Sequence, residues 1–366
     1  MKRIAIFCDG TWNRSDATHP TNVVRLARAV RRTAANSVTQ QVIYVAGVGS
    51  GRGTTVLTRS LDRITGGAFG LGLSQNIEEV YWHLAFNYEP GDEIYIFGFS
   101  RGAFTARSLA GLLRSAGIPS QDNLWRIPEA MKEYQKRGEA GHPDTERGIA
   151  FRKSFSPGIA TSDEDLAARG GQCHLLKIAY LGVWDTVGSL GVPNQLFLSK
   201  FVNWRYQFHD HQLSSSVLAA RHAVSVDERR RNFMPTLWEN LDQLNTDKVT
   251  RPYRQSWFPG DHGAVGGGGN LRDMPDATLR WVAEGALRAG LEMRADEFGE
   301  MTSQANALGA LRSSDADPSF LTRIMGWWSS DRDPPERAGD VSPEALERLA
   351  KRPEYRPKSL EPYWPD

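Results

Sequence analysis

Cysteine, an excess of charge of either sign and long apolar runs are all scarce in this chain. The 366 residues contain only 2 cysteines, and the spacing of Cys8 and Cys173 fits neither a structural zinc site nor a disulfide framework. Lysine and arginine number 44 against 43 aspartate and glutamate residues, so the net charge of +1 gives no electrostatic case for nucleic acid as a partner. No apolar run approaches a transmembrane span, and the first residues, MKRIAIFCDG, hold too short an apolar run for a signal peptide. These absences predict a protein that is cytoplasmic as synthesised, with export by a dedicated secretion system left open.

One stretch combines a strand, a tight turn and a helix. Glu93–Phe97 is rich in aromatic and β-branched residues and follows a Pro-Gly-Asp turn, which predicts a strand. Residues 98–102, GFSRG, form a G-x-S-x-G around Ser100, and a helical pattern follows. In a nucleophile elbow the serine sits on a strained strand-to-helix turn whose neighbours must be small. The alternative is an ordinary turn in which Ser100 only caps the helix. The context favours the elbow.

Two downstream residues complete the order Ser, Asp, His that is typical of hydrolases with this elbow. Asp185 follows the apolar run His174–Val183, at the end of a predicted strand, where open α/β sheets bind their ligands. His262 follows a short predicted strand, Tyr253–Pro259, and is framed by glycines. A serine hydroxyl needs an imidazole to accept its proton, and the imidazole needs a carboxylate to fix its tautomer. We therefore predict a catalytic triad of Ser100, Asp185 and His262.

Other carboxylates compete with Asp185 for the role of orienting His262. The rivals are Asp9, Asp227 and Asp261. Asp261 adjoins the histidine in sequence, so its side chain is expected to diverge from the ring. The choice among these carboxylates stays open at the level of sequence.

Backbone N–H groups at two turns are candidates for an oxyanion hole. Arg101 begins the predicted helix after the nucleophile, and Gly10 and Thr11 follow the first predicted strand. Asp9 precedes this second turn, where a negative charge would oppose a developing oxyanion unless it is turned away or neutralised.

Chemistry of this kind needs no cofactor and no metal. The glycine-rich stretch Gly47–Gly53 lacks both the Gly-Lys-Ser/Thr ending of a Walker A loop and the glycine register of a dinucleotide fingerprint. The segment FCDGT is similar to the D-x-D-G-T of haloacid-dehalogenase-type phosphatases, but Phe7 occupies the position of their nucleophilic aspartate. We expect neither nucleotide binding nor an aspartyl-phosphate mechanism.

Strand and helix patterns alternate along most of the chain, which predicts an α/β fold with a mostly parallel central sheet flanked by helices. Beside the strands already named, the expected elements are strands at Ile4–Cys8 and Gln41–Val45 and helices at Thr21–Thr33, Ser74–Tyr88, Ser214–Val226 and Ser342–Ala350. Residues 119–172 are polar and interrupt the alternation, as either a cap over the site or an external elaboration. We predict a hydrolase domain at 1–292 with a cap-like insertion at 119–172, and a C-terminal extension at 293–366 packed on it.

Two adjacent tryptophans in the C-terminal extension offer an apolar surface. Phe320–Trp328 could touch a bilayer interface or a lipid chain, although packing back on the hydrolase body is the favoured interpretation.

Several motifs in order make the sequence recognisable. They are FCDGTWN, YVAGVGSG, YEPGDEIYIFGFSRGAFTARSLAG, YLGVWDTVGSLG, HAVSVDERRRNFMP and WFPGDHGAVGGGG. Together they resemble a bacterial and fungal α/β-hydrolase family, domain of unknown function 2235, which includes phospholipase effectors of type VI secretion systems. The resemblance runs to about Leu291 and resumes at SPEALERLAKRPEYRPKSL. It implies a serine esterase or lipase-like hydrolase with Ser100 as nucleophile, Asp185 as acid and His262 as base.

The sequence departs from the family in two respects. Members often carry an Asp two residues after the histidine, where this chain has Ala264, so more weight falls on Asp185. The secreted effectors also tend to carry extra membrane-facing regions, for which this chain has little room.

Residues and resemblance together predict a two-step hydrolysis of carboxylic esters through an acyl-enzyme. The residues reach ester hydrolysis, and the resemblance adds lipid or phospholipid acyl esters as the substrate. The alternatives are a hydrolase of small non-lipid esters and a catalytically weak binding or toxin-associated protein on the same fold. A membrane surface and a secretion or immunity partner are left open as partners.

Overall fold

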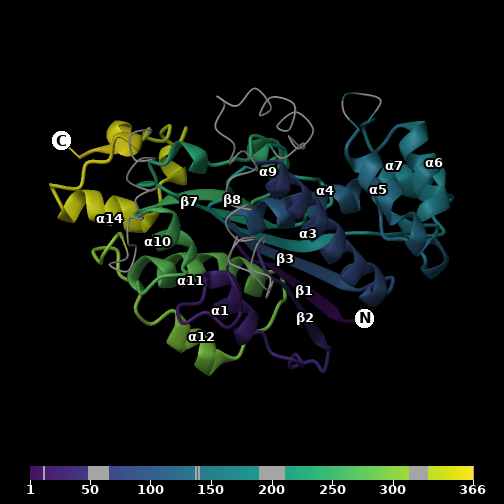
Figure 1. Ribbon diagram of the computed structural model, residues 1–366, viewed down its shortest axis with the longest axis horizontal. Helices are drawn as coiled ribbons and strands as arrows, with labels where there is room; N and C mark the ends of the chain where they lie inside the picture. The colour runs from purple at the N-terminus through teal and green to yellow at the C-terminus, as the bar shows by residue number, and fades with distance from the viewer. Residues whose placement is uncertain are drawn as a thin grey trace.

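A parallel sheet of six strands forms the centre of the molecule (Figure 1). The computed structural model describes residues 1–10, 13–47, 66–136, 138, 141–188, 211–312 and 329–365. The strand order is β2-β1-β3-β6-β7-β8, and every neighbouring pair is parallel. The strands are β1 (Arg3–Cys8), β2 (Gln40–Val45), β3 (Glu93–Phe99), β6 (Ile178–Trp184), β7 (Ala220–Ser225) and β8 (Tyr253–Phe258). The mostly parallel α/β sheet predicted from the alternation is confirmed.

The direction of winding reverses between β1 and β3. The chain moves outward from β1 to β2 and then returns to place β3 on the other side of β1, with Cys8 opposite Gly98. The loops that leave β1 and β3 therefore begin side by side at the carboxyl edge of the sheet. Such a switch point is where open α/β sheets bind their ligands.

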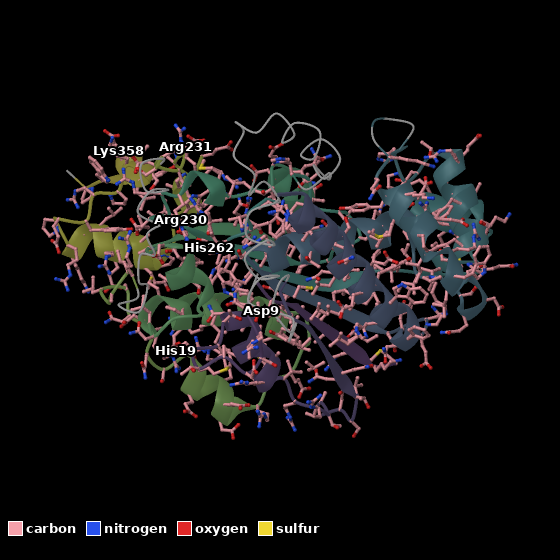
Figure 2. All side chains as sticks on the ribbon, in the orientation of Figure 1. Asp9, His19, Arg230, Arg231, His262 and Lys358 are labelled. Atoms are coloured by element: carbon pink, nitrogen blue, oxygen red, sulfur yellow. The ribbon has the colours of Figure 1, made fainter. Side chains whose placement is uncertain are left out.

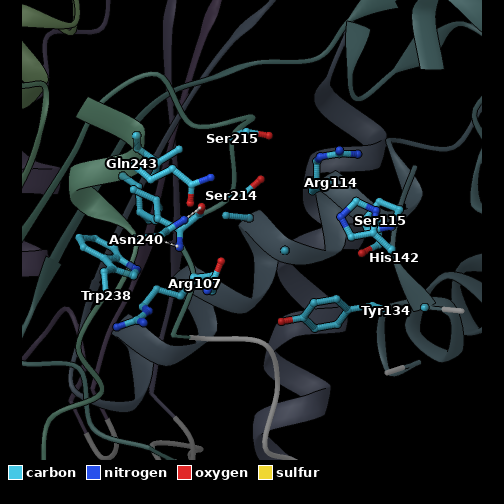
Figure 3. Close-up of a pocket in the computed structure, with 18 of the residues that line it drawn as sticks. Arg107, Arg114, Ser115, Tyr134, His142, Ser214, Ser215, Trp238, Asn240 and Gln243 are labelled. Atoms are coloured by element: carbon cyan, nitrogen blue, oxygen red, sulfur yellow. Dashed lines mark hydrogen bonds between the residues drawn. The ribbon is translucent and has the colours of Figure 1, made fainter. Parts of the chain in front are cut away.

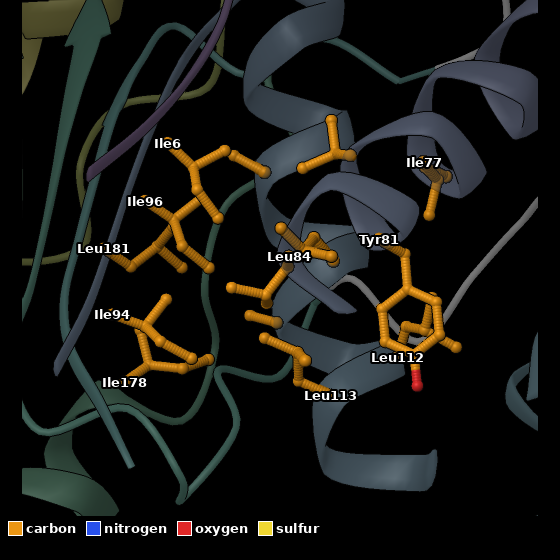
Figure 4. Packing of buried hydrophobic residues seen from close by; sticks show 14 of the residues in the cluster. Ile6, Ile77, Tyr81, Leu84, Ile94, Ile96, Leu112, Leu113, Ile178 and Leu181 are labelled. Carbon is orange, nitrogen blue, oxygen red and sulfur yellow. The ribbon is translucent and has the colours of Figure 1, made fainter. Parts of the chain in front are cut away.

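Helices cover both faces of the sheet. In Figure 1, α3 and α4 lie on one side of it, and α1, α11 and α12 lie on the other. Their bounds are α1 (Asn22–Ala29), α3 (Gly66–Asn87), α4 (Arg101–Ala116), α11 (Asp273–Arg288) and α12 (Ala295–Met301), and two short helices, α9 (Leu241–Asn245) and α10 (His262–Gly266), follow β7 and β8. Figure 4 shows how Ile6, Ile96 and Leu181 of the strands meet Leu84 of α3 and Leu113 of α4. Burial of this continuous apolar layer is the main driving force for placing α4, and with it the turn at its start.

One predicted helix is a strand in the structure. The sequence predicts a helix over Ser214–Val226, but the second half of that segment is β7, which lies between β6 and β8 and is buried throughout. The prediction was wrong because Arg221 and His222 interrupt the apolar run that marks a central strand. Inside the fold both find partners: Arg221 donates to the carbonyl of Trp281, and His222 bonds to Gln255. Tertiary contacts here outweigh local propensity.

The insertion packs beside the far end of α4 rather than beside Ser100. It contains η1 (Gln121–Arg126), α5 (Ile127–Tyr134), α6 (Glu146–Phe155), α7 (Asp163–Ala168) and the two-stranded pair β4 (Ile159–Ala160) and β5 (His174–Leu175). Arg152 donates to the carbonyl of Ser115, and Ser156 donates to that of Ala116. A helix of this length separates those carbonyls from Ser100 by about 24 Å. These contacts with α4 thus lie at its end remote from Ser100, and a role of the insertion as a cap stays a prediction.

Residues 329–365 pack against the last two strands of the sheet. They contain η5 (Ala338–Asp340), α14 (Pro343–Lys351) and η6 (Lys358–Tyr363). Val341, Leu349 and Leu360 form a buried cluster with Val224 of β7 and Trp257 of β8. Figure 1 shows this segment at the opposite end of the molecule from the insertion. The C-terminal segment is therefore in position to contribute to the site at the ends of β6, β7 and β8.

Three sequence expectations fall outside the described residues: the backbone of Thr11, most of Gly47–Gly53 and the segment Phe320–Trp328. Within the described ranges, no helix is both long enough and apolar enough to pass through a bilayer.

Candidate active site

Ser100 sits on a strained turn between β3 and α4. Its φ and ψ are 59° and −124°, a conformation that residues with a side chain rarely adopt. Its N–H donates to the carbonyl of Trp184 at 3.0 Å, which joins the turn to the end of β6. Ser100 is the N-cap of α4, yet its side chain makes no capping hydrogen bond. The capping alternative therefore fails, and the hydroxyl is left for another role.

The two glycines of the motif are required by close backbone contacts. A Cβ on Gly98 would lie 2.4 Å from the carbonyl oxygen of Gly102. A Cβ on Gly102 would lie 2.2 Å from the carbonyl oxygen of Cys8 and 2.4 Å from that of Asp9. Since none of these contacts can be relieved by rotating a side chain, only glycine fits at both positions. The turn is thereby pressed against the end of β1.

Asp185 and His262 meet at the same edge of the sheet. His262 Nδ1 lies 2.6 Å from Asp185 Oδ2, and Ser225 N donates to Asp185 Oδ1 at 2.9 Å. Asp185 is fully buried, and His262 is 7% exposed. A carboxylate acceptor places the imidazole proton on Nδ1, which leaves the Nε2 lone pair to accept a proton from elsewhere.

Two aromatic rings pack against the imidazole of His262. The ring of Phe99, next to the nucleophile in sequence, lies 4.6 Å from that of His262 between centroids. The ring of Phe233 lies 4.8 Å away in an edge-on arrangement. The backbone N–H of His262 donates to Glu228, at 3.3 Å. Packing and the Asp185 hydrogen bond together restrict the ring to one orientation.

The rival carboxylates have other partners. Asp261 caps α10 by accepting from Ala264 N at 3.0 Å, so its side chain diverges from the ring as expected. Asp227 accepts from Gly260 N at 2.6 Å and from Tyr355 Oη at 2.8 Å. Among the described residues, Asp185 is thus the carboxylate that is hydrogen-bonded to the imidazole of His262.

Asp9 is held by three donors at the end of β1. It accepts from Gly10 N at 2.8 Å, from Thr21 Oγ1 at 2.9 Å and from Tyr44 Oη at 2.8 Å. Burial raises its pKa to about 6, although these three hydrogen bonds oppose the rise. Figure 2 shows Asp9 and His262 in the middle of the molecule.

The candidate oxyanion groups differ in how the structure places them. Arg101 is the first residue of α4, where backbone N–H groups point away from the body of the helix. Gly10 adjoins Ser100, since a Cβ on Gly10 would lie 3.3 Å from Ser100 Cβ. The N–H of Gly10, however, already donates to Asp9, which the sequence could not reveal.

Sequence reasoning missed one charged residue at this site. Arg332 is buried in the C-terminal segment and donates from Nη1 to Asp185 Oδ1 at 2.6 Å and from Nη2 to Oδ2 at 3.0 Å. Burial alone would raise the pKa of Asp185, but the Arg332 guanidinium and the hydrogen bond from His262 hold it well below its usual range. No motif marks Arg332, which lies 147 residues from its partner.

A pocket of about 740 Å³ lies along the second half of α4 (Figure 3). Its lining includes Arg107 and Arg114 of α4, Tyr134 and His142 of the insertion, and Trp238 before α9. Ser100, Asp185 and His262 are not among the lining residues. The pocket is therefore separate from the candidate active site. The described residues also contain no group of three or more histidine, cysteine or acidic side chains placed to hold a metal ion.

The chain is similar to proteins of one family. The family model for T6SS, phospholipase effector Tle1-like, catalytic domain, matches residues 2–285. An uncharacterized protein of Saccharomyces cerevisiae, YEL023C, is 30% identical over 244 residues, which cover 63% of this chain and 32% of that protein. The chain thus spans about a third of the length of this curated relative.

Solved structures give weaker likenesses. An uncharacterized protein from Pseudomonas aeruginosa has 16% identity and a TM-score of 0.44, with 89% of this chain and 50% of that chain covered. A Tle1 effector bound to the VgrG spike of the type 6 secretion system has 19% identity and a TM-score of 0.38, with 75% and 53% covered.

Proposed function

This chain belongs to the family of T6SS Tle1-like phospholipase effector catalytic domains, and we propose that it hydrolyses carboxylic esters of lipids through Ser100, His262 and Asp185. The observation that carries the proposal is the 2.6 Å hydrogen bond between His262 Nδ1 and Asp185, at the sheet edge where Ser100 occupies its strained turn. A histidine oriented by a buried carboxylate, at the sheet edge that also carries a serine whose side chain makes no capping hydrogen bond, supplies the groups that nucleophilic acyl transfer uses.

The reaction follows from the proton positions. His262 Nε2 accepts the proton of Ser100 as the hydroxyl oxygen attacks the ester carbonyl, and Asp185 stabilises the imidazolium that forms. The tetrahedral intermediate collapses when the imidazolium gives its proton to the departing alcohol, which leaves an acyl group on Ser100. Water then attacks the acyl-enzyme by the same route, with His262 again taking the proton, and the free acid departs.

Backbone N–H groups would stabilise the oxyanion of each tetrahedral intermediate. Arg101 at the start of α4 is supported by the direction of the helix axis and by the partial positive charge of a helix N-terminus. Gly10 has the right position beside Ser100, but its N–H must leave Asp9 to reach an oxyanion. We keep Gly10 and Thr11 as the proposed second donors. Asp9 competes with an oxyanion for the N–H of Gly10.

The lipid part of the proposal depends on the family rather than on a shaped binding cleft. The carboxylic ester follows from the three side chains, and the acyl or phospholipid character follows from the family description. A hydrolase of small esters and a weakly catalytic binding protein would use the same fold. A membrane surface and a secretion partner likewise stay predictions.

A chain-length series of p-nitrophenyl esters, followed by phospholipid vesicles, tests the substrate class. We expect kcat/KM to rise with acyl length and to fall at least about 10³-fold in Ser100→Ala. Ser154→Ala, which changes an exposed serine of the insertion, is the matched control and should keep the wild-type rate. A preference for short acyl chains would favour the small-ester alternative. No turnover of any ester by folded protein would favour the binding protein.

A further inference from the structure

The guanidinium of Arg332 fills the space behind Asp185. Besides its two bonds to the carboxylate, Nη1 donates to the carbonyl of Ser225 at 2.7 Å and Nη2 to that of Phe233 at 2.6 Å. The side chain is 1% exposed, so solvent does not screen its charge. Four hydrogen bonds to three residues fix the plane of the guanidinium, which a lysine ammonium could not reproduce.

One oxygen of the Asp185 carboxylate accepts hydrogen bonds from both His262 and Arg332. Asp185 Oδ2 accepts from His262 Nδ1 and also from Arg332 Nη2. With a neutral imidazole, the negative charge of Asp185 is balanced by the guanidinium. If the guanidinium were absent, the buried carboxylate would be uncompensated, and a protonated His262 would be its nearest replacement partner. An imidazolium cannot accept the proton of Ser100.

The other charged and titratable groups around the pair do not supply this balance. They are Asp9 after β1, Arg107 on α4, His222 on β7, Asp227, Glu228 and Arg230 after β7, and Asp261 before α10. Glu228 and Arg230 form a pair with each other at 2.7 Å. Nε2 of His222 accepts from Thr186 N at 3.1 Å, and burial lowers the pKa of His222 to about 3, so this ring stays neutral. Within the part of the chain that the structure describes, Arg332 is therefore the guanidinium in contact with Asp185.

We propose that Arg332 is a positioning residue that neutralises Asp185 and thereby keeps His262 available as a base at neutral pH, so that the C-terminal segment sets the pH range of the hydrolase. This inference rests on the proposed triad. Arg332 lies beyond residues 2–285, which match the family model. The residue proposed to neutralise Asp185 therefore comes from a part of the chain that the family match does not cover.

The test is the pH dependence of ester hydrolysis between pH 5 and 9 in wild type, Arg332→Gln and Arg332→Lys. Two unit charges about 5 Å apart in a partly polar interior move a titration by about one to two pH units, so we expect the acid limb of kcat/KM to move up by about that much in Arg332→Gln. Its rate should recover most of the wild-type value at pH 9. Arg332→Lys keeps the charge and should keep the acid limb while lowering the plateau.

A matched control separates this role from loss of stability. Arg152 is another fully buried arginine paired with an aspartate, at 2.7 Å from Asp165 in the insertion. Arg152→Gln should lower the melting temperature without moving the acid limb. If Arg332→Gln does not fold, the comparison uses two variants that both lack the carboxylate of residue 185. One is Asp185→Asn alone, and the other combines Asp185→Asn with Arg332→Met. Labelling of Ser100 by a fluorophosphonate, read at each pH, should then show a lower acid limb in the single variant than in the double variant, because the retained guanidinium charge disfavours protonation of His262.

The outcomes are distinct. An acid limb in Arg332→Gln that coincides with those of wild type and Arg152→Gln overturns this inference and leaves the proposed function standing. Coinciding acid limbs in Asp185→Asn and in its combination with Arg332→Met would likewise overturn this inference and leave the proposed function standing. Folded wild-type protein that neither hydrolyses esters nor labels at Ser100 overturns both.

Discussion

Replacing Asp9 by asparagine should stabilise the protein at alkaline pH and leave it nearly unchanged at acid pH. Asp9 is 2% exposed, and its carboxylate accepts from Gly10, Thr21 and Tyr44. Asparagine can keep this network, because its Oδ1 accepts from Gly10 and Thr21 while its amide donates to the phenol oxygen of Tyr44. The substitution therefore removes the charge with little loss of hydrogen bonding.

The magnitude follows from the pKa of Asp9, which burial raises from 3.8 to about 6. Between these values the folded protein binds more protons than the unfolded chain, so its stability falls as the pH rises. Above the folded-state pKa the ionised side chain costs about 3 kcal/mol, because each tenfold change in proton affinity corresponds to about 1.4 kcal/mol. Below about pH 4 the carboxyl is protonated in both states and the cost vanishes.

Urea unfolding at pH 4.5, 6 and 8 measures this cost directly. We expect Asp9→Asn to exceed wild type in free energy of unfolding by about 1–3 kcal/mol at pH 8 and by much less at pH 4.5. Asp122→Asn, at an exposed position in η1, is the control and should show no such pH dependence. An Asp9→Asn variant that is equally stabilised at both pH values, or destabilised at pH 8, would refute the reasoning.

Three further substitutions test other parts of the structure. Gly102→Ala would push a methyl group to 2.2 Å from a backbone carbonyl oxygen at the end of β1. Urea unfolding should therefore show a loss of about 3 kcal/mol in the free energy of unfolding. The control Gly299→Ala, with nothing within 4 Å of the added group, should be neutral or slightly stabilising. Asp165→Asn removes the carboxylate partner of buried Arg152, and we expect a loss of about 3–5 kcal/mol by the same method, with labelling of the nucleophile unchanged below the melting temperature. Asp185→Asn should lower kcat for ester hydrolysis by a factor on the order of 10⁴, and a fall under about tenfold would point to another carboxylate.

Local constraints explain what the sequence could reveal. The strained turn at Ser100 needs glycines at fixed offsets, because the backbone of α4 meets that of β1, and such a need leaves a readable motif. Asp185 and His262 could be proposed because parallel strands end at one edge of the sheet, so residues that follow different strands gather there.

Contacts between distant segments explain what the sequence could not reveal. Arg332 is one of many arginines, and only the packing of the C-terminal segment on β7 and β8 brings it to Asp185. The bond from Gly10 N to Asp9 depends on the path of one turn, which residue types do not determine. β7 was mistaken for a helix because its polar His222 has its hydrogen-bond partners on other elements of the fold.

Covalent labelling with a fluorophosphonate tests the central claim, an activated serine at the elbow, most directly. The modified peptide is located by mass spectrometry in wild type, Ser100→Ala and His262→Ala, each shown to be folded by circular dichroism. The account predicts an adduct on Ser100 that is absent from Ser100→Ala and forms at least about 10²-fold more slowly in His262→Ala. Labelling of a different residue, or an equal rate in His262→Ala, would contradict it.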